Sequence, residues 1–574
     1  MSKLKFCLLL VTLYPLYVGA QYKSAVWSPD NGDGTYTNPV LYADYSDPDV
    51  CAVGEDYYLT ASSFNCVPGL PILHSKDLVN WEIVGHALQE LEPKSLFDDP
   101  QHGKGVWAPS IRHHNDSLYI YWGDPDQGIF MVKRRLPKTL SQIGGEWSEP
   151  ICVIAGKGMI DPCPLWDEDG RCFLVNAWAN SRAGFNSVLS VRELSADGSR
   201  AISQPRIAFD GGQENHTAEG PKFYKRDGWY WLMCPAGGVE MGWQLAMRSR
   251  SPFGPYEWRR VMWQGNTDIN GPHQGAWVHT AFGEDWFLHF NDKGAYGRVV
   301  CLQPVDWSGG WPMMGKNGEP YTRYLKPKSS SKIMVNPQEN DEFSDGLGLQ
   351  WQWHANYHQF YGQPSAAGIY RLYTMDLPSD FRSLWDIPNL LLQKPTAPRF
   401  TATAKVRFAA KEDGQYAGLV MMGRDYSALI IRRDGDGFLL QRHTCINADE
   451  GQAEKRQTVA ALQPSDLDSI PYSPAIYLDL FLRLTVKDGI VNFYYSLDGN
   501  HFKSAGKLEQ SDAGLGSAGP ELAQSQFKSG GEPFRMRQGK WIGAKLGFVA
   551  ACIDRKDSRG WLDIDWIRIT STNE

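Results

Sequence analysis

The sequence lacks a long apolar run beyond its first twenty residues. No later stretch reaches about 18 consecutive apolar residues, the length that spans a bilayer. An excess of positive charge is also missing, because 65 Asp and Glu outnumber 57 Lys and Arg and give a net charge of -8. That balance argues against nucleic acid or anionic membrane surfaces as partners. We therefore expect neither membrane insertion nor nucleic-acid binding.

Paired cysteines are lacking as well. The ten cysteines are scattered without a CxxC pair, and one of them, Cys7, lies in the N-terminal apolar run. The remaining nine are typical of neither a zinc site nor a disulfide framework, and most should be small buried side chains. Two pairings stay open from spacing alone, Cys51 with Cys66 and Cys163 with Cys172.

The N-terminus has the pattern of an export signal. Lys3 and Lys5 precede the apolar run 6–13, and Val18-Gly19-Ala20 offers small residues for cleavage. We predict a signal peptide over residues 1–20 and a soluble mature chain that is secreted or periplasmic. Cleavage would remove both lysines and move the formal charge from -8 to -10.

One hairpin pattern recurs five times in the first half of the chain. Each copy is an acidic or glycine turn followed by an aromatic-rich strand, and the steps between copies are 60, 53, 58 and 58 residues. Short alternating strands with such a period predict a β-propeller with one four-stranded sheet per blade. We therefore expect an all-β protein whose residues 21–325 form five blades around a narrow axial funnel. The anchors of the five copies are Asp56, Asp116, Asp169, Asp227 and Asp285.

The second half of the chain has a different texture. Residues 326–340 are rich in Lys, Ser and Pro and have the composition of a linker. From residue 341 the repeat disappears, but hairpin signals continue around Asp434-Gly435-Asp436 and Lys487-Asp488-Gly489, and residues 561–570 alternate strictly. No 12-residue helical periodicity stands out. We predict an antiparallel β-sandwich over residues 341–574.

The repeat also places three acids at one level of the funnel. Counting back eight or nine residues from the anchors reaches the start of the innermost strand, which holds Asp47 in blade one, Asp161 in blade three and Glu219 in blade four. Blade two has Trp107-Ala108-Pro109 there, and blade five has Pro272-His273-Gln274. We expect the three carboxylates to converge on the axis.

Such carboxylates cannot all ionise freely, because like charges raise one another's pKa. Blades three and four are neighbours, so Asp161 should lie beside Glu219 and help to keep it protonated, while Asp47 should lie across the funnel. A protonated carboxyl that faces an ionised one can cleave a glycosidic bond. A separation of about 6.5–9.5 Å leaves room for a water and gives inversion, against about 5–5.5 Å for retention. Asp47 and Glu219 belong to blades that are not neighbours, which favours the longer separation and therefore inversion.

Each acid also has an ordinary interpretation. Asp47 and Asp161 both precede proline, and Asp-Pro is a common start of a turn. Capping gives no reason, however, for three of five blades to carry an acid at this point. Calcium binding is the other alternative, although calcium loops usually gather their oxygen ligands within one segment.

At these positions the chain resembles glycoside hydrolase family 43. The resemblance covers about residues 35–320 and implies inverting hydrolysis, with Asp47 as general base, Glu219 as general acid and Asp161 as the residue that tunes and orients the acid. The family's usual substrates are α-L-arabinofuranosides and β-D-xylosides. The matching motifs are Asn38-Pro39-Val40-Leu41, Asp47-Pro48-Asp49, Tyr57-Tyr58, residues 74–81, Trp107-Ala108-Pro109, Ile160-Asp161-Pro162, Glu219-Gly220-Pro221-Lys222, Gly297-Arg298, Gln303 and residues 307–312.

The resemblance implies roles for four further residues. Arg298 matches an arginine that contacts sugar hydroxyls, although a salt-bridged loop arginine would look the same. His273 matches a histidine that in some members helps to hold a central calcium or a water, so a structural calcium stays open and no other cofactor or metal is expected. A satisfied core histidine is the alternative. Phe64 and Trp107 are candidates for the pocket walls, or for blade core.

The C-terminal half resembles the concanavalin-like sandwich that several branches of this family carry. Relatives can insert a loop of this domain into the funnel, which favours release of single sugars. Trp353, His354 and residues 357–361 are candidates for that loop, and ordinary packing is the alternative. Residues 65–68, Asn-Cys-Val-Pro, depart from the aromatic residues of many xylosidases in the family.

Together these features predict an exported, inverting, exo-acting hydrolase of terminal pentoses on plant cell-wall polysaccharides or oligosaccharides. The activity would be that of an α-L-arabinofuranosidase, a β-D-xylosidase or both. A non-catalytic carbohydrate-binding propeller is the alternative of another class. A galactosidase and an endo-arabinanase are the alternatives among enzymes.

Overall fold

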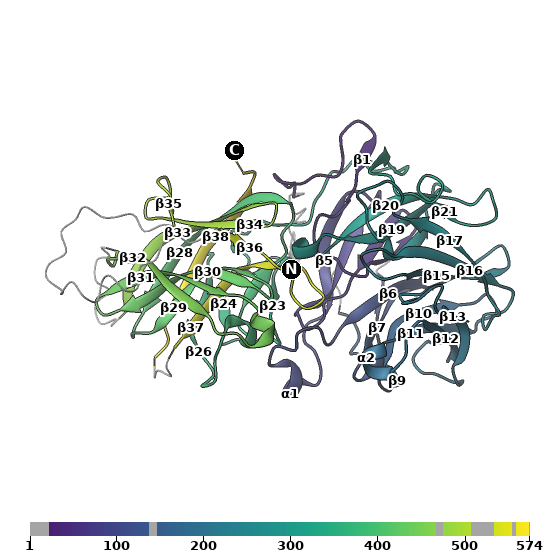
Figure 1. The fold of residues 1–574 in the computed structure, drawn as a ribbon, viewed down its shortest axis with the longest axis horizontal. Helices are drawn as coiled ribbons and strands as arrows, with labels where there is room; N and C mark the ends of the chain where they lie inside the picture. The colour runs from purple at the N-terminus through teal and green to yellow at the C-terminus, as the bar shows by residue number, and fades with distance from the viewer. Residues whose placement is uncertain (1–21, 137–145, 466–474, 507–532, 554–557, 573–574) are drawn as a thin grey trace, which may run out of the picture.

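The computed structural model describes residues 22–136, 146–465, 475–506, 533–553 and 558–572. Two β-rich bodies lie side by side, one built from the first half of the chain and one from the second (Figure 1). The predicted all-β fold, a five-bladed propeller followed by a sandwich, is confirmed. The predicted signal peptide lies outside the described residues.

Each blade is a four-stranded antiparallel sheet of consecutive strands. The first strands contact one another around the axis, β2 with β6, β6 with β10, β10 with β14 and β18 with β2, so they are the innermost strands. The predicted anchors mark the first hairpin of every blade: Asp116, Asp169 and Asp227 lie in the turn between the first and second strand, and Asp56 and Asp285 begin the second strand. The strands are β2 (Asp49–Val53), β3 (Asp56–Thr60), β4 (Gly69–Ser75) and β5 (Trp81–Leu88) in blade one; β6 (Trp107–His114), β7 (Ser117–Asp124), β8 (Gly128–Arg135) and β9 (Ile151–Ala155) in blade two; β10 (Met159–Trp166), β11 (Cys172–Trp178), β12 (Val188–Leu194) and β13 (Arg206–Asp210) in blade three; β14 (Lys222–Arg226), β15 (Trp229–Ala236), β16 (Trp243–Ser249) and β17 (Glu257–Trp263) in blade four; and β18 (His273–His279), β19 (Asp285–Asp292), β20 (Arg298–Asp306) and β21 (Met313–Met314) in blade five.

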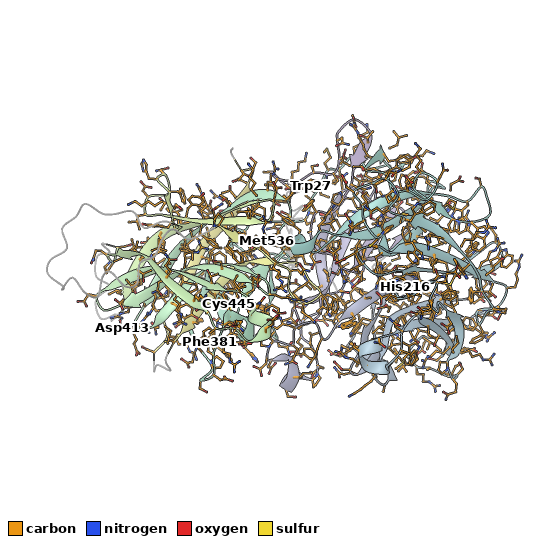
Figure 2. All side chains as sticks on the ribbon, viewed as in Figure 1. Trp27, His216, Phe381, Asp413, Cys445 and Met536 are labelled. Atoms are coloured by element: carbon orange, nitrogen blue, oxygen red, sulfur yellow. The ribbon has the colours of Figure 1, made fainter. Side chains whose placement is uncertain are left out.

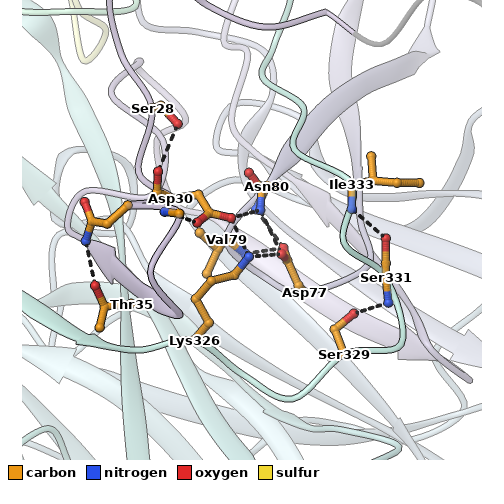
Figure 3. A network of polar contacts seen from close by, with 12 residues as sticks. Ser28, Asp30, Thr35, Asp77, Val79, Asn80, Lys326, Ser329, Ser331 and Ile333 are labelled. Carbon is orange, nitrogen blue, oxygen red and sulfur yellow. Dashed lines mark hydrogen bonds and ion pairs between the residues drawn. The ribbon is translucent and has the colours of Figure 1, made fainter.

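Polar contacts join the chain before blade one to the chain after blade five. β1 (Thr35–Thr37) pairs antiparallel with β22 (Arg323–Leu325). The Lys326 ammonium then contacts Asp30 at 2.5 Å and Asp77 at 2.9 Å, and Asn80 donates to both carboxylates (Figure 3). The charged network of Lys326, Asp30 and Asp77 therefore closes the ring of blades. Residues 326–340 continue from this network without forming a helix or strand.

The sandwich consists of two eight-stranded sheets. The hairpins predicted around 434–436 and 487–489 are β30–β31 and β33–β34, and pairing is antiparallel except that β26 runs parallel to β37. One sheet contains β23 (Gln352–Trp353), β26 (Met375–Asp376), β27 (Leu391–Gln393), β29 (Gln415–Met422), β30 (Tyr426–Asp434), β31 (Gly437–Cys445), β32 (Lys455–Leu462) and β37 (Lys545–Cys552); the other contains β24 (Gly362–Pro364), β25 (Tyr370–Tyr373), β28 (Arg399–Ala410), β33 (Ile476–Lys487), β34 (Ile490–Ser496), β35 (Lys503–Ser504), β36 (Phe534–Arg535) and β38 (Trp561–Thr570).

Helices are short and sit in connections. Within the described residues none is long and apolar enough to cross a membrane. They are the α-helices α1 (Lys94–Phe97) and α2 (Asn180–Ala183) and the 3-10 turns η1 (Gly294–Tyr296), η2 (Leu384–Asp386) and η3 (Ala448–Glu450).

The two domains share one apolar core. Side chains of both meet between the ribbons, with Met536 on the sandwich side (Figure 2). The backbone of Val67 exchanges two hydrogen bonds with that of Trp353, and the Tyr296 hydroxyl donates to the Pro398 carbonyl at 2.7 Å. Burial of this apolar surface is the main contribution to holding the domains together.

The aromatic stretch proposed as a funnel loop belongs to this interface. Trp353 is buried and stacks on Tyr357 with ring centroids 5.1 Å apart, and the buried His354 ring lies 4.6 Å from that of His102. Of the two interpretations, ordinary packing is the one observed. None of the nine described cysteines forms a disulfide, so neither suggested pairing is present.

Candidate active site

A small cavity of about 120 Å³ opens on the propeller axis. Residues from all five blades and from the sandwich line it, and the three predicted carboxylates converge there, as do Arg298, Trp107 and Phe64. His273 is not among the lining residues. The lining consists of Asp47, Phe64, Trp107, Ala108, Ile160, Asp161, Glu219, Gln274, Arg298 and Trp541.

Asp47 enters the cavity from the connection just before β2. Its backbone has a φ of 54°, an uncommon left-handed conformation that turns the side chain toward the axis. The Ser62 hydroxyl donates to Oδ2 at 2.6 Å, and Arg298 Nη1 donates to Oδ1 at 3.0 Å. Both carboxylate oxygens therefore accept a bond, and the arginine contact is charge-assisted.

Asp161 lies on β10, at a bulge between Ile160 and Cys163. Its φ of 56° repeats that of Asp47, and bulges commonly redirect side chains near active sites. The Gly220 N–H donates to Oδ2 at 2.7 Å, which places Asp161 beside Glu219 as predicted. Burial first, then the negative charges of Glu219 and Asp47, raise the pKa of Asp161 well above its ordinary value.

Glu219 is the most exposed of the three acids, with its side chain 32% accessible. Its Oε1 lies 3.0 Å from Nε2 of His273, whose ring is fully buried. Gly220 follows at a φ of 58°, and a Cβ there would come within 2.6 Å of the Gln274 side chain. His273 therefore orients Glu219 from behind the cavity wall, and the glycine lets the backbone approach closely.

Arg298 is fixed through its backbone as well as its side chain. Its N–H donates to Asp44 Oδ1 at 2.8 Å, and its guanidinium lies 4.8 Å from the Phe290 ring centroid. Gly297 before it has a φ of 79°, and a Cβ there would come within 2.4 Å of Asp44. The arginine therefore presents its remaining N–H donors from a rigid position beside Asp47.

Aromatic rings form another part of the cavity wall. Phe64 and Trp107 meet edge to face with centroids 6.4 Å apart, and the Trp107 indole N–H donates to the Gly103 carbonyl at 2.9 Å. Flat apolar rings next to hydroxyl-binding groups suit a sugar, which has one polar edge and apolar faces.

Trp541 is the residue that sequence reasoning missed. It lies between β36 and β37 of the sandwich, its ring centroid is 6.5 Å from that of Trp107, and it is 46% exposed. Asp44 Oδ2 accepts the Gly543 N–H at 3.0 Å, and the Ala544 N–H donates to the Ala295 carbonyl at 2.8 Å. No repeat or motif marks this segment, because its position depends on how the two domains pack.

Gln274, which also lines the cavity, had a weaker signal. It lies at the axial position of blade five that the repeat identified, next to His273, and its φ is 32°. Its side chain is an amide with no titratable group, so the pattern of carboxylates in the repeat does not include it.

The residues around His273 do not form a calcium cage. Calcium takes six to eight oxygen ligands, whereas Nε2 of His273 is directed at Glu219 and Nδ1 has no partner among the described protein atoms. Over the described part of the chain, no group of three or more His, Cys, Asp or Glu is placed to hold a metal ion. The structural calcium left open by the resemblance stays a prediction, and no chemical step below uses it.

The site combines the groups that acid–base cleavage of a glycoside needs. One wall carries a carboxylate held by a serine and an arginine, and another carries a more exposed carboxyl group held by a histidine. The third acid, Asp161, is buried, and its raised pKa favours the protonated form of its carboxyl group. Two carboxyl groups on different walls of one cavity can act on opposite faces of a bound ring.

Comparison with known proteins agrees with this chemistry. The model of Glycosyl hydrolases family 43 matches residues 36–312, and that of the Beta xylosidase C-terminal Concanavalin A-like domain matches residues 340–570. A putative beta-xylosidase from Xylanibacter ruminicola is 35% identical over 92% of this chain and 88% of its own. A non-reducing end alpha-L-arabinofuranosidase from Bacteroides ovatus is 31% identical over 71% of this chain and 78% of its own.

Solved structures share the fold across both domains. That of a xylan beta-1,4-xylosidase from Bacillus halodurans C-125 has a TM-score of 0.75 at 21% identity and covers 93% of this chain and 100% of the other. The resemblance noted in the sequence is thus confirmed over both halves of the molecule. This chain is a glycoside hydrolase that belongs to glycosyl hydrolase family 43 and carries the family's concanavalin-like C-terminal domain.

Proposed function

We infer that this enzyme releases single terminal pentoses from plant cell-wall polysaccharides or oligosaccharides, with inversion at the anomeric carbon. The observation that carries this inference is the small axial cavity in which Asp47 and Glu219 lie on different walls. A cavity of about 120 Å³ walled by Trp541 suits one terminal sugar better than a continuous chain. The β-xylosidase and arabinofuranosidase names of the relatives support a pentose.

In the proposed reaction Asp47 is the general base. It takes a proton from a water whose oxygen forms a bond to the anomeric carbon, while the bond from that carbon to the leaving oxygen breaks. Glu219 gives its proton to the leaving oxygen, so the two acids exchange protonation states in one turnover. Ser62 and Arg298 hold the base, and His273 holds the acid.

Asp161 takes the part of a positioning residue. Its bond to the Gly220 N–H fixes the backbone next to the acid, and the negative charges of Glu219 and Asp47 add to burial in raising its own pKa. Arg298 and Gln274 are the proposed donors and acceptors for the sugar hydroxyls, with Phe64 and Trp107 against the apolar face of the ring.

Hydrolysis of 4-nitrophenyl β-D-xyloside and 4-nitrophenyl α-L-arabinofuranoside, measured side by side, tests this proposal. We expect turnover of at least one, with the xyloside faster because a relative that is 35% identical over 92% of this chain is named a putative beta-xylosidase. Glu219→Gln should lose turnover and keep the melting temperature of the wild type. Sugar binding without turnover by the wild type would instead support the non-catalytic propeller.

Export is a separate part of the proposal and rests on the sequence of residues 1–20. We expect the mature protein, recovered from the periplasm or the medium of its native host, to begin at Gln21. An intact N-terminus in the cytoplasmic fraction would contradict export and leave the proposed chemistry untouched.

A further inference from the structure

One connection that contacts residues of the cavity carries an aromatic pair that the proposed reaction does not use. Residues 178–187 connect β11 to β12 and contain α2. Phe185 is 44% exposed although it is a large apolar residue, and its ring lies 5.2 Å from that of Trp178. The Trp178 indole N–H donates to the Ser190 hydroxyl at 2.9 Å, so the ring that supports Phe185 is itself held in place.

The start of this stretch is tied to the aromatic wall of the cavity. The Arg182 guanidinium lies 5.7 Å from the ring centroid of Trp107, which lines the cavity. Two of its nitrogens donate to the Asp126 carboxylate at 3.1 and 3.2 Å. Where β10 pairs with β11, Ile160, which lines the cavity, lies opposite Ala177, the residue immediately before Trp178.

The end of this stretch is tied to the segment that carries Glu219. The Ser187 hydroxyl accepts the Thr217 N–H at 2.8 Å, and the Ser187 carbonyl accepts the Gly211 N–H at 2.8 Å. Thr217 follows His216, which Figure 2 labels on the propeller, and precedes Glu219 by two residues. Phe185 therefore belongs to a connection that contacts Trp107 through Arg182 and the segment before the proposed acid through Ser187.

The direction in which a substrate leaves the cavity follows from the chemistry. The acid must touch the oxygen of the breaking bond, so whatever is attached to that oxygen lies on the Glu219 side of the rim. An exposed ring supported by a second ring offers a flat apolar surface there, and sugar rings present flat apolar faces.

We propose that Phe185, supported by Trp178, is the binding platform for the sugar residue on the leaving side of the scissile bond. The inference rests on the proposed exo-acting pentosidase activity. Its ligand is the second pyranose or furanose ring of an oligosaccharide, which stacks on Phe185 while the terminal ring occupies the axial cavity. Arg182, fixed by Asp126, limits the platform on the Trp107 side.

The test compares two substrates that need the same help from the acid but differ in the leaving group. Xylobiose leaves a sugar ring, whereas methyl β-D-xyloside leaves only methanol, and both leaving groups are aliphatic alcohols whose oxygen takes the proton of the acid. If the aryl assay selects arabinose, α-1,5-arabinobiose and methyl α-L-arabinofuranoside take their places. Phe185→Ala should lower kcat/KM for the disaccharide about fivefold to tenfold, the size expected for one aromatic stacking contact.

The methyl glycoside should be hydrolysed by Phe185→Ala at the wild-type rate. Phe185→Tyr should restore the disaccharide value, because it keeps a flat ring. Met241→Ala, which alters another exposed apolar side chain of the propeller, is the matched control and should change neither substrate.

Three results separate the possibilities. An unchanged kcat/KM for the disaccharide in Phe185→Ala would overturn the platform. An equal loss for both substrates would also overturn it, since Phe185 would then support the cavity through Ser187 and Thr217. If the wild type hydrolyses neither glycoside, the proposed function fails first, and the platform fails with it.

Discussion

The propeller and the sandwich contribute to the active site in different ways. The propeller repeats one sheet five times and brings the starts of its inner strands together, so side chains far apart in sequence meet on one axis. Among the described residues, the sandwich reaches the cavity at one, Trp541, from a connection between strands. The difference suggests that the chemistry belongs to the repeat and that the boundary of the cavity belongs to the domain packed against it.

The largest effect is expected when a catalytic carboxylate of the propeller is replaced. Asp47→Asn should lower kcat by about a hundredfold to ten-thousandfold, the usual contribution of a general base. The substituted side chain can still accept from Ser62 or Arg298, so the fold should persist. Steady-state kinetics on the aryl glycosides measure the loss. A variant that keeps more than a tenth of wild-type kcat would remove Asp47 from the role of base.

Asp161→Asn should have a smaller effect on rate. The amide oxygen of the variant can still accept the Gly220 N–H, so we expect a fall in kcat/KM of only about tenfold, which corresponds to about 1.4 kcal/mol. The same substitution has a second expected outcome in the free energy of unfolding.

That outcome follows from the raised pKa of Asp161. The folded protein keeps this proton to higher pH than the unfolded chain does, so the stabilising contribution is present below about pH 3.9 and is lost as pH rises through the folded pKa. An amide does not titrate, so the Asp161→Asn variant does not lose stability in this way as pH rises. It should therefore melt at a higher temperature than the wild type at pH 7. The difference should shrink toward pH 4 in thermal melts. A variant that is less stable than the wild type only at neutral pH would contradict the raised pKa.

Asp44→Asn tests the junction between the two domains. The carboxylate accepts the backbone N–H groups of Arg298 and Gly543 on different oxygens, and an amide can accept on only one. We expect a loss of about 1–3 kcal/mol in the free energy of unfolding for the unpaired N–H. We also expect kcat/KM to fall severalfold.

The matched control is Ser46→Ala, which removes only the third bond to Asp44 and should do less. A double-mutant cycle with Trp541→Ala should show that the two effects on kcat/KM are not additive, because both act on one loop. Strict additivity would show that Asp44 does not act through Trp541.

The smallest effect is expected when Trp541, the cavity residue of the sandwich, is replaced. Trp541→Ala should raise KM about twofold to tenfold and leave kcat near the wild-type value, because the ring contacts the bound sugar equally before and during reaction. Trp541→Phe should be intermediate. A fall in kcat comparable to that of Asp47→Asn would mean that the sandwich takes part in the chemistry.

The part of the site that the repeat governs could be predicted from sequence. Asp47 and Asp161 lie two residues before the point at which Asp49 and Cys163 pair with the second strand, so the two acids occupy equivalent positions in their blades. Glu219 lies three residues before Lys222, the corresponding residue of blade four, so the shared phase is approximate. All three still reach the cavity, and the backbone has a positive φ at Asp47, at Asp161 and at Gly220, which follows Glu219.

The remaining part depends on contacts between elements distant in sequence. Trp353 and Trp541 are both aromatic residues of the sandwich, and no local pattern distinguishes the one in the interface from the one in the cavity. What distinguishes them is the partner, Val67 for Trp353 and the Asp44–Gly543 bond for the loop of Trp541. Such partners are set by domain packing, which periodicity does not report.

The most direct test of the central claim is the anomer formed first by the wild type. If Asp47 and Glu219 act from opposite faces of the bound ring, proton NMR during hydrolysis of a β-D-xyloside should show α-xylose before mutarotation mixes the anomers. Initial formation of β-xylose would mean retention through a covalent intermediate and would contradict the roles assigned to the two acids. With an α-L-arabinofuranoside, the β anomer should appear first for the same reason.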